Sequence, residues 1–244
     1  MPSDTSAAWG HGRDLTGRVH TLAVGRVAPL RHGGLDIPSA IRKIPVTGTV
    51  MLSGLGLAGD EQADSVLHGG PDKAVSVYPW EHYAYWAQEL GLVLGDAAFG
   101  ENVTSVGLLE SEVFVGDVFD WGQATVQVSQ PRRPCFKVGA RYDRGDLPAA
   151  VERTRRTGFY LRVLRSGRVA AADALVLRDV DPVGLSVADV MTVLVDGPEA
   201  AGLTLARVLL AQHLLPPRWV AELDQLGPGG SLQTDAQRRS GTGG

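Results

Sequence analysis

The spacing of apolar and polar residues predicts strands along most of the chain before position 180. Apolar and β-branched residues dominate segments 18–27 and 43–52 without helical periodicity, which predicts two extended segments. Further short β-rich runs, separated by glycine-containing turns, are 112–115, 118–121, 124–129, 159–164 and 174–177. Such closely spaced strands are typical of a barrel or sandwich.

Helical spacing is clear in segment 80–90. Tyr83, Trp86 and Leu90 fall on one helical face, and Gly91 follows as a stop signal. We expect the aromatic residues of this face to lie in the core. A second short helix is expected at 147–155, so the body is predicted to be a β-dominated α+β fold rather than alternating βαβ units.

The residue composition changes after Asp181 and Pro182, where Leu, Ala and Val become frequent. Three segments, 186–195, 198–212 and 216–226, each begin with a capping residue or an early proline, which predicts three short helices. Ser186 is expected to be an N-cap rather than a nucleophile, because its surroundings lack the final glycine of a nucleophile elbow. So small a helical unit should pack on the β body or on another subunit.

These patterns divide the chain into two tails and two structured regions. Both tails are rich in small and polar residues and are expected to be disordered. The predicted parts are an N-terminal tail (1–17), a β-rich domain (18–180), a three-helix domain (185–226) and a C-terminal tail (227–244).

Composition excludes several classes of protein. A hydrophobic fraction of 44% and a formal charge of -4 suit a globular protein and argue against nucleic acid as the main partner. No apolar run approaches the length of a membrane span, and the first residues lack a secretory signal, so we expect a cytoplasmic protein. With 1 cysteine the chain cannot form an intramolecular disulfide, a Cys-rich zinc site or a Cys-ligated iron–sulfur cluster.

That cysteine, Cys135, ends a stretch that leaves a predicted strand and contains two prolines, Pro131 and Pro134. The prolines predict an ordered loop without regular hydrogen bonding. Arg132, Arg133 and Lys137 place cations beside the sulfur, which favours the thiolate that attacks electrophiles or binds soft metals. The alternative interpretation is a buried, inert cysteine that acts as a small apolar side chain.

Two local patterns resemble known sites but lack their context. Segment 54–59 matches G-x-G-x-x-G, yet Gly69 and Gly70 interrupt the helix that a dinucleotide-binding turn must open. Asp60, Asp64 and His68 recur at intervals of four, as metal ligands on a helix can. Capping or ion pairing is the favoured role of the two aspartates.

Two other loops could receive an anion, and a third lies at the entrance of a predicted strand. His68, Gly69, Gly70 and Lys73 combine exposed backbone N–H groups with cations, which fits an anion cradle or, alternatively, a tight turn. Glu101 and Asn102 precede a β-rich run. In segment 155–158 a pair of arginines, Thr157 and Gly158 suit phosphate or carboxylate contacts, although a solvated basic turn has the same composition.

Taken together and in this order, these stretches resemble the MOSC (molybdenum cofactor sulfurase C-terminal) domain family, and most of all its YiiM-like branch. The stretches that carry the resemblance are GLAGD at 56–60, HGGPDK at 68–73, FGEN at 99–102, VGD at 115–117, QPRRPC at 130–135 and RTG at 156–158. It spans roughly 18–180, and the three predicted C-terminal helices are similar to the 3-alpha domain that often follows in that branch.

The resemblance implies a MOSC-type β-barrel that binds a molybdopterin-type molybdenum cofactor, with Cys135 as the thiolate ligand of molybdenum. It implies proton donors at His68 and Glu101. The expected cofactor contacts are His68, Gly69, Gly70, Lys73, Asn102, Arg132, Arg133, Arg156, Thr157 and Gly158.

The implied reaction is reduction of a small N-hydroxylated compound, such as a hydroxylaminopurine, to an amine. An external electron-donating reductase is then the expected partner, and the C-terminal helices could support an oligomer. The alternative function is a carrier of molybdenum cofactor, or a sulfur-transfer protein that uses a Cys135 persulfide. A scaffold domain with an inert Cys135 is a third interpretation.

Overall fold

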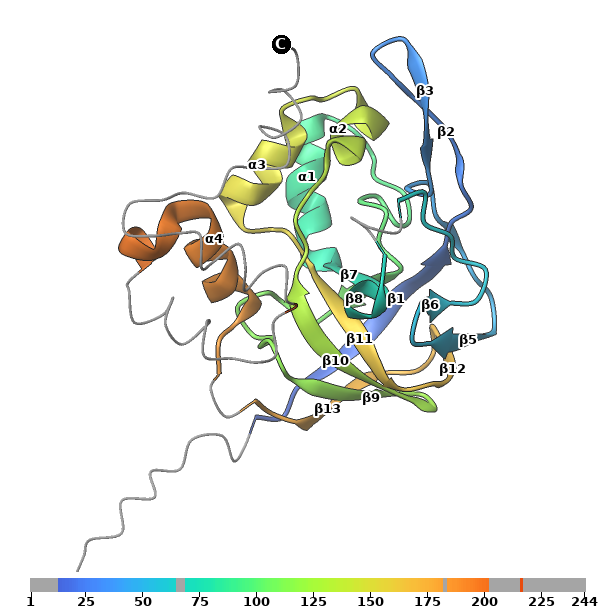
Figure 1. The fold of residues 1–244 in the computed structure, drawn as a ribbon, viewed down its shortest axis with the longest axis vertical. Helices are drawn as coiled ribbons and strands as arrows, with labels where there is room; N and C mark the ends of the chain where they lie inside the picture. Colours follow the sequence, from blue (N-terminus) through green and yellow to red (C-terminus); the bar gives the residue numbers. More distant parts are fainter. Residues whose placement is uncertain (1–12, 65–68, 182–183, 202–215, 217–244) are drawn as a thin grey trace, which may run out of the picture.

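A closed β-barrel forms the body of the molecule, as the strand spacing predicts. The computed structural model describes residues 13–64, 69–181, 184–201 and Pro216. Seven strands close the barrel in the order β13-β9-β10-β11-β7-β8-β1, and β1 pairs back onto β13 (Figure 1). Neighbouring strands are antiparallel except β7 and β8, which pair in parallel from Val77 and Val103.

The barrel strands are β1 (Thr16–Val24), β7 (Val75–Pro79), β8 (Val103–Val106), β9 (Val118–Trp121), β10 (Ala124–Pro131), β11 (Phe159–Arg165) and β13 (Leu175–Asp179). Outside the ring are β2 (Ala28–His32), β3 (Leu35–Ser39), β4 (Ile44–Pro45), β5 (Thr49–Ser53), β6 (Gly56–Leu57) and β12 (Gly167–Ala170). The helices are α1 (Tyr83–Leu90), α2 (Phe136–Tyr142), α3 (Leu147–Thr154) and α4 (Val187–Ala201), with 3₁₀ turns η1 (Pro71–Lys73) and η2 (Trp80–His82).

The main core fills the inside of the barrel. Alternate residues of β10, namely Ala124, Val126 and Val128, are fully buried in it, as period-two alternation requires. Burial of this apolar surface supplies the main driving force for closing the ring.

A second core lies under three helices at one end of the barrel, where α1, α2 and α3 group together (Figure 1). Tyr83 and Trp86 of α1 are buried there against Phe99, which confirms the expected core role of this helical face. Gly91 follows α1 in the left-handed conformation that favours glycine, with φ 65°, and so ends the helix where the sequence predicts.

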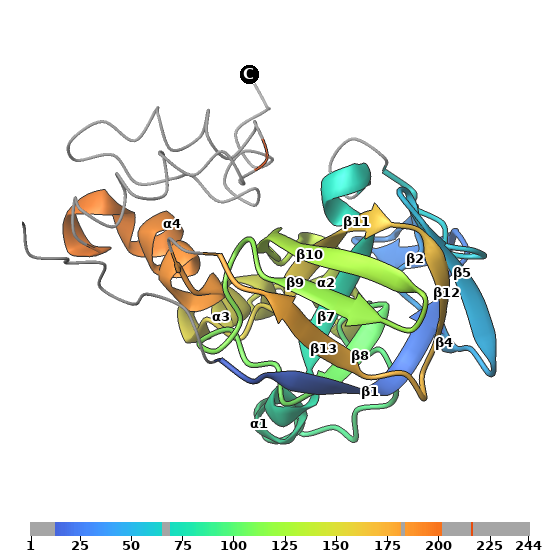
Figure 2. The ribbon, with the colours of Figure 1, turned by 90° about the horizontal axis from the view of Figure 1, so that it is seen from below.

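Helix α4 lies beside α3 and against β10 (Figure 2). Ser186 is its N-cap, as expected, because its Oγ accepts the N–H of Asp189 at 3.0 Å and the Asp189 carboxylate accepts the N–H of Ser186 at 3.1 Å. The helix continues to Ala201 through the break expected between Val195 and Pro198. The remainder of the predicted three-helix domain lies outside the described residues apart from Pro216. The number and bounds of its further helices therefore stay a prediction.

The sequence-based expectation is wrong at segment 112–115, which contains only an isolated bridge between Phe114 and Ser186. Strands β7 and β8 are absent from the expectation because neither alternates: all of β7 is buried, as are the first residues of β8. The ordered body also begins earlier than Arg18, since Thr16 belongs to β1 and Arg13 pairs with Asp117 at 2.7 Å.

Segment 54–59 forms a hairpin between β5 and β6 rather than a dinucleotide-binding turn, as its context indicates. Within the described part of the chain, no helix has both the length and the apolar character needed to cross a membrane.

Candidate functional site

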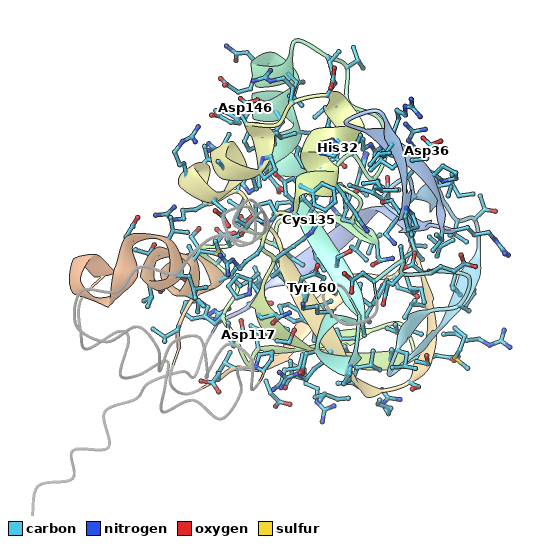
Figure 3. All side chains as sticks on the ribbon, turned by 45° about the horizontal axis from the view of Figure 1, so that its top comes forward. His32, Asp36, Asp117, Cys135, Asp146 and Tyr160 are labelled. Atoms are coloured by element: carbon cyan, nitrogen blue, oxygen red, sulfur yellow. The ribbon has the colours of Figure 1, made fainter. Side chains whose placement is uncertain are left out.

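A cavity of about 100 Å³ lies beside Cys135, where loops from several parts of the barrel meet. In the view of Figure 3, Cys135 lies at the start of α2, and Tyr160 of β11 lies on the same side of the molecule. The side chains that line the cavity and carry its chemistry are Lys43, Asp60, Lys73, Ser76, Asn102, Arg132, Cys135, Lys137 and Tyr160.

Cys135 is half-buried and is the residue before the first turn of α2. Pro131 ends β10, and the backbone from Arg132 to Cys135 has no regular structure, which confirms the ordered proline-rich loop. The carbonyl of Cys135 accepts the N–H of Val138 at 3.0 Å, which fixes the sulfur-bearing residue to the helix. The sulfur therefore lies on a rigid support at the cavity wall.

Arg132 is the arginine of the pair that lines the cavity. Its Nη2 donates to the carbonyl of Phe99, while its Nη1 is buried and has no hydrogen-bond partner among the described residues. The guanidinium of Arg133 instead lies 3.7 Å from the Glu152 carboxylate on α3. A buried guanidinium N–H without an acceptor is costly, so Arg132 is suited to hold an anion in the cavity.

Tyr160 borders the same cavity and interacts with Arg132. Burial raises the pKa of its hydroxyl, and the nearby Arg132 charge and hydrogen bond oppose that rise. The hydroxyl therefore stays neutral and is a hydrogen-bond donor at physiological pH.

Lys43, Asp60 and Asn102 form a connected group on the cavity wall. The Lys43 ammonium pairs with Asp60 Oδ1, and Asp60 Oδ2 accepts Asn102 Nδ2 at 2.9 Å. Asn102 Oδ1 accepts the Ser76 hydroxyl at 2.9 Å and the Ser76 N–H at 3.1 Å. Asn102 therefore lines the cavity, and its hydrogen bonds hold Asp60 in place. Its contact with the cofactor stays a prediction.

This ion pair accounts for Asp60, the first aspartate of the sequence pattern. Asp60 also accepts the N–H of Gly25 at 2.7 Å, and the segment from Ala58 to Asp64 contains no helix. Ion pairing, the favoured role for Asp60, is thus confirmed, whereas the shared helical face with Asp64 is wrong. His68 lies outside the described residues, so its assigned roles stay predictions.

Glu101 does not line the cavity. It is fully buried, with Oε1 bound by the hydroxyls of Tyr83 and Thr104 and Oε2 bound by the N–H of Phe99 at 2.9 Å. Burial, and next the Glu101 charge, raise the pKa of Tyr83, so the tyrosine remains the donor. Internal hydrogen bonds hold Glu101 in place, and its role as a proton donor stays a prediction.

The turn at Arg156 to Gly158 lies behind the cavity rather than in its wall. Arg156 stacks over the Tyr85 ring at 4.1 Å, and Thr157 is almost completely buried. Gly158 accepts the N–H of Arg132 at 2.9 Å and donates its own N–H to Glu110 at 2.7 Å. These contacts position Arg132, while the direct cofactor contacts expected of the turn remain predictions.

The glycine-rich loop reaches the cavity through Lys73. Gly70 has φ 94° and precedes η1, and its carbonyl accepts the N–H of Lys73 at 3.0 Å. The Lys73 Nζ lies 5.9 Å from the centre of the Tyr160 ring. Gly69 and Gly70 themselves do not line the cavity, so this loop has the geometry of a turn that carries one cation to it.

Sequence reasoning missed Lys43 and Tyr160 as parts of the site. Lys43 lies in the short segment between β3 and β4 and Tyr160 lies on β11, so only the tertiary fold brings them to the cavity beside Cys135. One signal was present for Lys43: the chain has three lysines, and the other two, Lys73 and Lys137, lie in motifs already assigned to the site.

The residues present fit a cofactor that is held by one thiolate and by cations. Cys135 offers a soft ligand, and the unpartnered Arg132 Nη1 offers a donor for a phosphate or similar anion. Among the described residues, no three His, Cys, Asp or Glu side chains converge as the ligands of a metal ion. The donor set thus matches a metal that brings further ligands with it.

Comparison with known proteins agrees with the fold and with the motifs. The family model of the MOSC domain matches residues 64–176. The uncharacterized protein YflK of Bacillus subtilis is 42% identical over 203 residues, covering 83% of this chain and 91% of YflK. Protein YiiM of Escherichia coli is 48% identical over 137 residues, covering 55% of this chain and 61% of YiiM.

A protein of Gibberella moniliformis named reductase is 36% identical over 163 residues, which cover 64% of this chain and 28% of that longer protein. Among solved structures, the crystal structure of YiiM from Geobacillus stearothermophilus superposes with a TM-score of 0.70 at 31% identity. This superposition covers 86% of this chain and 98% of that structure.

Proposed function

Because this chain belongs to the MOSC domain family, as a YiiM-like member, we propose that it binds molybdenum cofactor beside Cys135 and reduces N-hydroxylated compounds to amines. The family is associated with molybdenum cofactor, and one relative is named a reductase. The observation that carries the proposal is that one cavity brings together a half-buried Cys135 and a buried Arg132 Nη1 that has no partner within the described part of the chain.

Cys135 is the residue that would hold the metal. A thiolate is a soft ligand that suits molybdenum, and Arg132 and Lys137 line the same cavity as the sulfur. The extended backbone at Cys135 and the start of α2 hold the sulfur in one place. A rigid ligand position lowers the cost of ordering the site on binding.

Arg132, Lys73 and Lys137 would hold the anionic part of the cofactor. All three line the cavity, and the Arg132 guanidinium is fixed through Phe99 while one of its N–H groups lacks an acceptor. The Gly158 carbonyl anchors the Arg132 backbone from behind. A phosphate received here would supply an acceptor for the Arg132 Nη1 donor, which has no partner among the described residues.

Bound in this cavity, the cofactor would supply the two-electron reduction, while the protein binds, orients and protonates the substrate. The neutral Tyr160 hydroxyl and the polar groups of the cavity wall would orient the N–OH group of a small substrate. The electrons would come from an external reductase, as the single cysteine excludes a Cys-ligated cluster in this chain.

The test is turnover of 6-hydroxylaminopurine with an artificial electron donor, using the full chain purified from a host that makes molybdenum cofactor. We expect the wild-type protein to form adenine and Cys135→Ser to lose at least about a hundredfold in rate, since serine is a poor ligand for a soft metal. Retention of full activity by Cys135→Ser would rule out the thiolate ligand.

The same preparations separate reduction from the carrier function. A wild-type protein that holds cofactor and passes it to a cofactor-free enzyme, but turns over no substrate, would replace the reductase proposal with that of a carrier. Thermal unfolding of each variant serves as the folding control.

A further inference from the structure

Lysine is confined to the cavity. The chain has 23 basic residues, of which Lys43, Lys73 and Lys137 are the lysines and the others are arginines. All three lysines line the cavity beside Cys135. Guanidinium groups keep their proton under all ordinary conditions, whereas an ammonium group can release one when it is desolvated. The distribution places every lysine of the chain at the candidate site.

Lys43 is held firmly in place. Its side chain is 7% exposed and that of its partner Asp60 is 2% exposed. Asp60 is fixed in turn by the N–H of Gly25 at 2.7 Å and by Asn102 at 2.9 Å. Substrate-independent contacts thus set the position of the ammonium group before any ligand arrives.

The Lys43 ammonium group also has N–H donors without a partner among the described residues. It carries three N–H bonds, and Asp60 is its single hydrogen-bond partner in the part of the chain that the structure describes. Because Lys43 lines the cavity, a ligand there can accept a hydrogen bond from one of the remaining N–H groups. A buried cation is costly unless such acceptors are supplied, so a ligand oxygen would gain affinity at this position.

The electrostatics favour release of the proton. Burial lowers the pKa of Lys43, Asp60 opposes that change through its charge and hydrogen bond, the Arg132 charge lowers the pKa further and Glu101 raises it. Lys73, Lys137, Glu61 and Asp64 also line the cavity. The net result is a stronger acid than an ordinary lysine, as general acid catalysis near neutral pH requires.

We propose that Lys43 is a catalytic residue of this cavity, which hydrogen-bonds the hydroxyl oxygen of the N-hydroxylated substrate and protonates it as it leaves. This inference rests on the proposed reductase function. The N–O bond of R–NH–OH breaks with two electrons from the external reductase. The Lys43 proton and the departing hydroxyl form water, a second proton from solvent completes the amine, and solvent then reprotonates Lys43.

Kinetics with matched variants provide the first test. Lys43→Met removes the acid at similar side-chain length, and Lys43→Arg keeps the charge but not the ability to release a proton. Both should lower kcat by about a hundredfold to ten-thousandfold without lowering molybdenum content. The control is Arg31→Met, which removes a cation from a side chain that is 69% exposed on β2 and should leave kcat unchanged.

The pH profile supplies a second readout. The wild-type kcat should fall as pH rises through the lowered pKa of Lys43, because the acid is then deprotonated, and this alkaline limb should be absent from the residual activity of Lys43→Met. An unchanged alkaline limb in Lys43→Met would overturn the proposal.

A third readout needs no turnover. Because the chain has three lysines, labelling with [ζ-15N]lysine gives one side-chain NMR signal for each, and Lys43→Met assigns the signal of Lys43. Adding 6-hydroxylaminopurine to the full-chain protein should shift the Lys43 signal, and adenine, which lacks the hydroxyl group, should shift it much less. Equal shifts with both compounds would count against hydrogen bonding to the hydroxyl oxygen.

The outcomes separate the two proposals. Wild-type turnover with full kcat in Lys43→Met overturns the role of Lys43 and leaves the reductase function standing. A wild-type protein that holds cofactor but cannot reduce the substrate overturns both.

Discussion

Lys43, Glu101 and Asn102 all carry polar groups near the cavity, but their neighbours leave different atoms free. Both oxygens of Glu101 are bound inside the protein, and the Asn102 amide holds Asp60 and Ser76 in place. Lys43 alone of the three keeps donors without a partner in the described structure. Whether a polar residue acts on a ligand or supports its neighbours is therefore decided by its satisfied hydrogen bonds, which residue type does not reveal.

The two arginines before Cys135 provide a residue-scale prediction. Arg132→Met removes the donor that lines the cavity, so we expect at least a tenfold drop in bound molybdenum, about 1.4 kcal/mol or more of binding free energy. Arg133→Met removes a cation that pairs with Glu152 and should leave molybdenum bound while lowering the free energy of unfolding by about 1 kcal/mol. Metal analysis and denaturant unfolding measure the two effects, and the reverse order would contradict the assignment.

At the residue scale the sequence predicts Cys135, Arg132 and Lys73 because each lies in a loop with a chemical signature. It cannot predict the partners of Glu101 or the cavity position of Tyr160. Those depend on which segments the barrel brings together, such as β11 beside β7 and β10.

The junction between β10 and α2 is the element that places Arg132 and Cys135 at the cavity. Pro131 ends the strand, the short segment from Arg132 to Cys135 crosses the cavity wall, and α2 packs Val138 into the core beneath the helices. Behind it, the turn before β11 holds the Arg132 backbone. Loops thus carry the reactive groups while strands and helices fix their positions.

Gly158 provides an element-scale prediction, since its φ of 71° favours glycine and an added Cβ would lie 2.2 Å from the Val77 carbonyl oxygen. Gly158→Ala should lower the free energy of unfolding by more than about 3 kcal/mol, through backbone strain and the displacement of β11 from β7. The matched control is Gly91→Ala, where φ is 65° and nothing lies within 4 Å of the added atom. It should cost about 1 kcal/mol. Equal losses in denaturant unfolding would contradict the close packing at Gly158.

Sequence patterns predict elements well where periodicity is strong. The helix of Tyr83 and Trp86, the cap at Ser186 and strands β9, β10, β11 and β13 are confirmed. Helix α2 is not predicted because it is short, contains few apolar residues and follows a proline-rich loop. Strand β7 is not predicted because it is buried on both faces and shows no alternation of apolar and polar residues.

At the scale of the whole molecule, closure of the ring by β1 and β13 brings the two ends of the barrel domain together. That closure is a tertiary pairing between distant segments, so the sequence predicts a barrel or sandwich without choosing between them. The motif order that resembles the MOSC family makes the choice, and the structure confirms it. The lining of the cavity comes from several segments between Ser39 and Tyr160, so the cavity too depends on contacts between segments that are distant in the sequence.

Binding of molybdenum in this cavity through Cys135 is tested most directly by the molybdenum and pterin content of freshly purified full-chain protein. We expect about one molybdenum per wild-type chain, together with pterin, and at least a tenfold lower molybdenum content in Cys135→Ser, which should still unfold in one cooperative transition. Wild-type protein without molybdenum, or equal molybdenum in wild type and Cys135→Ser, would contradict it.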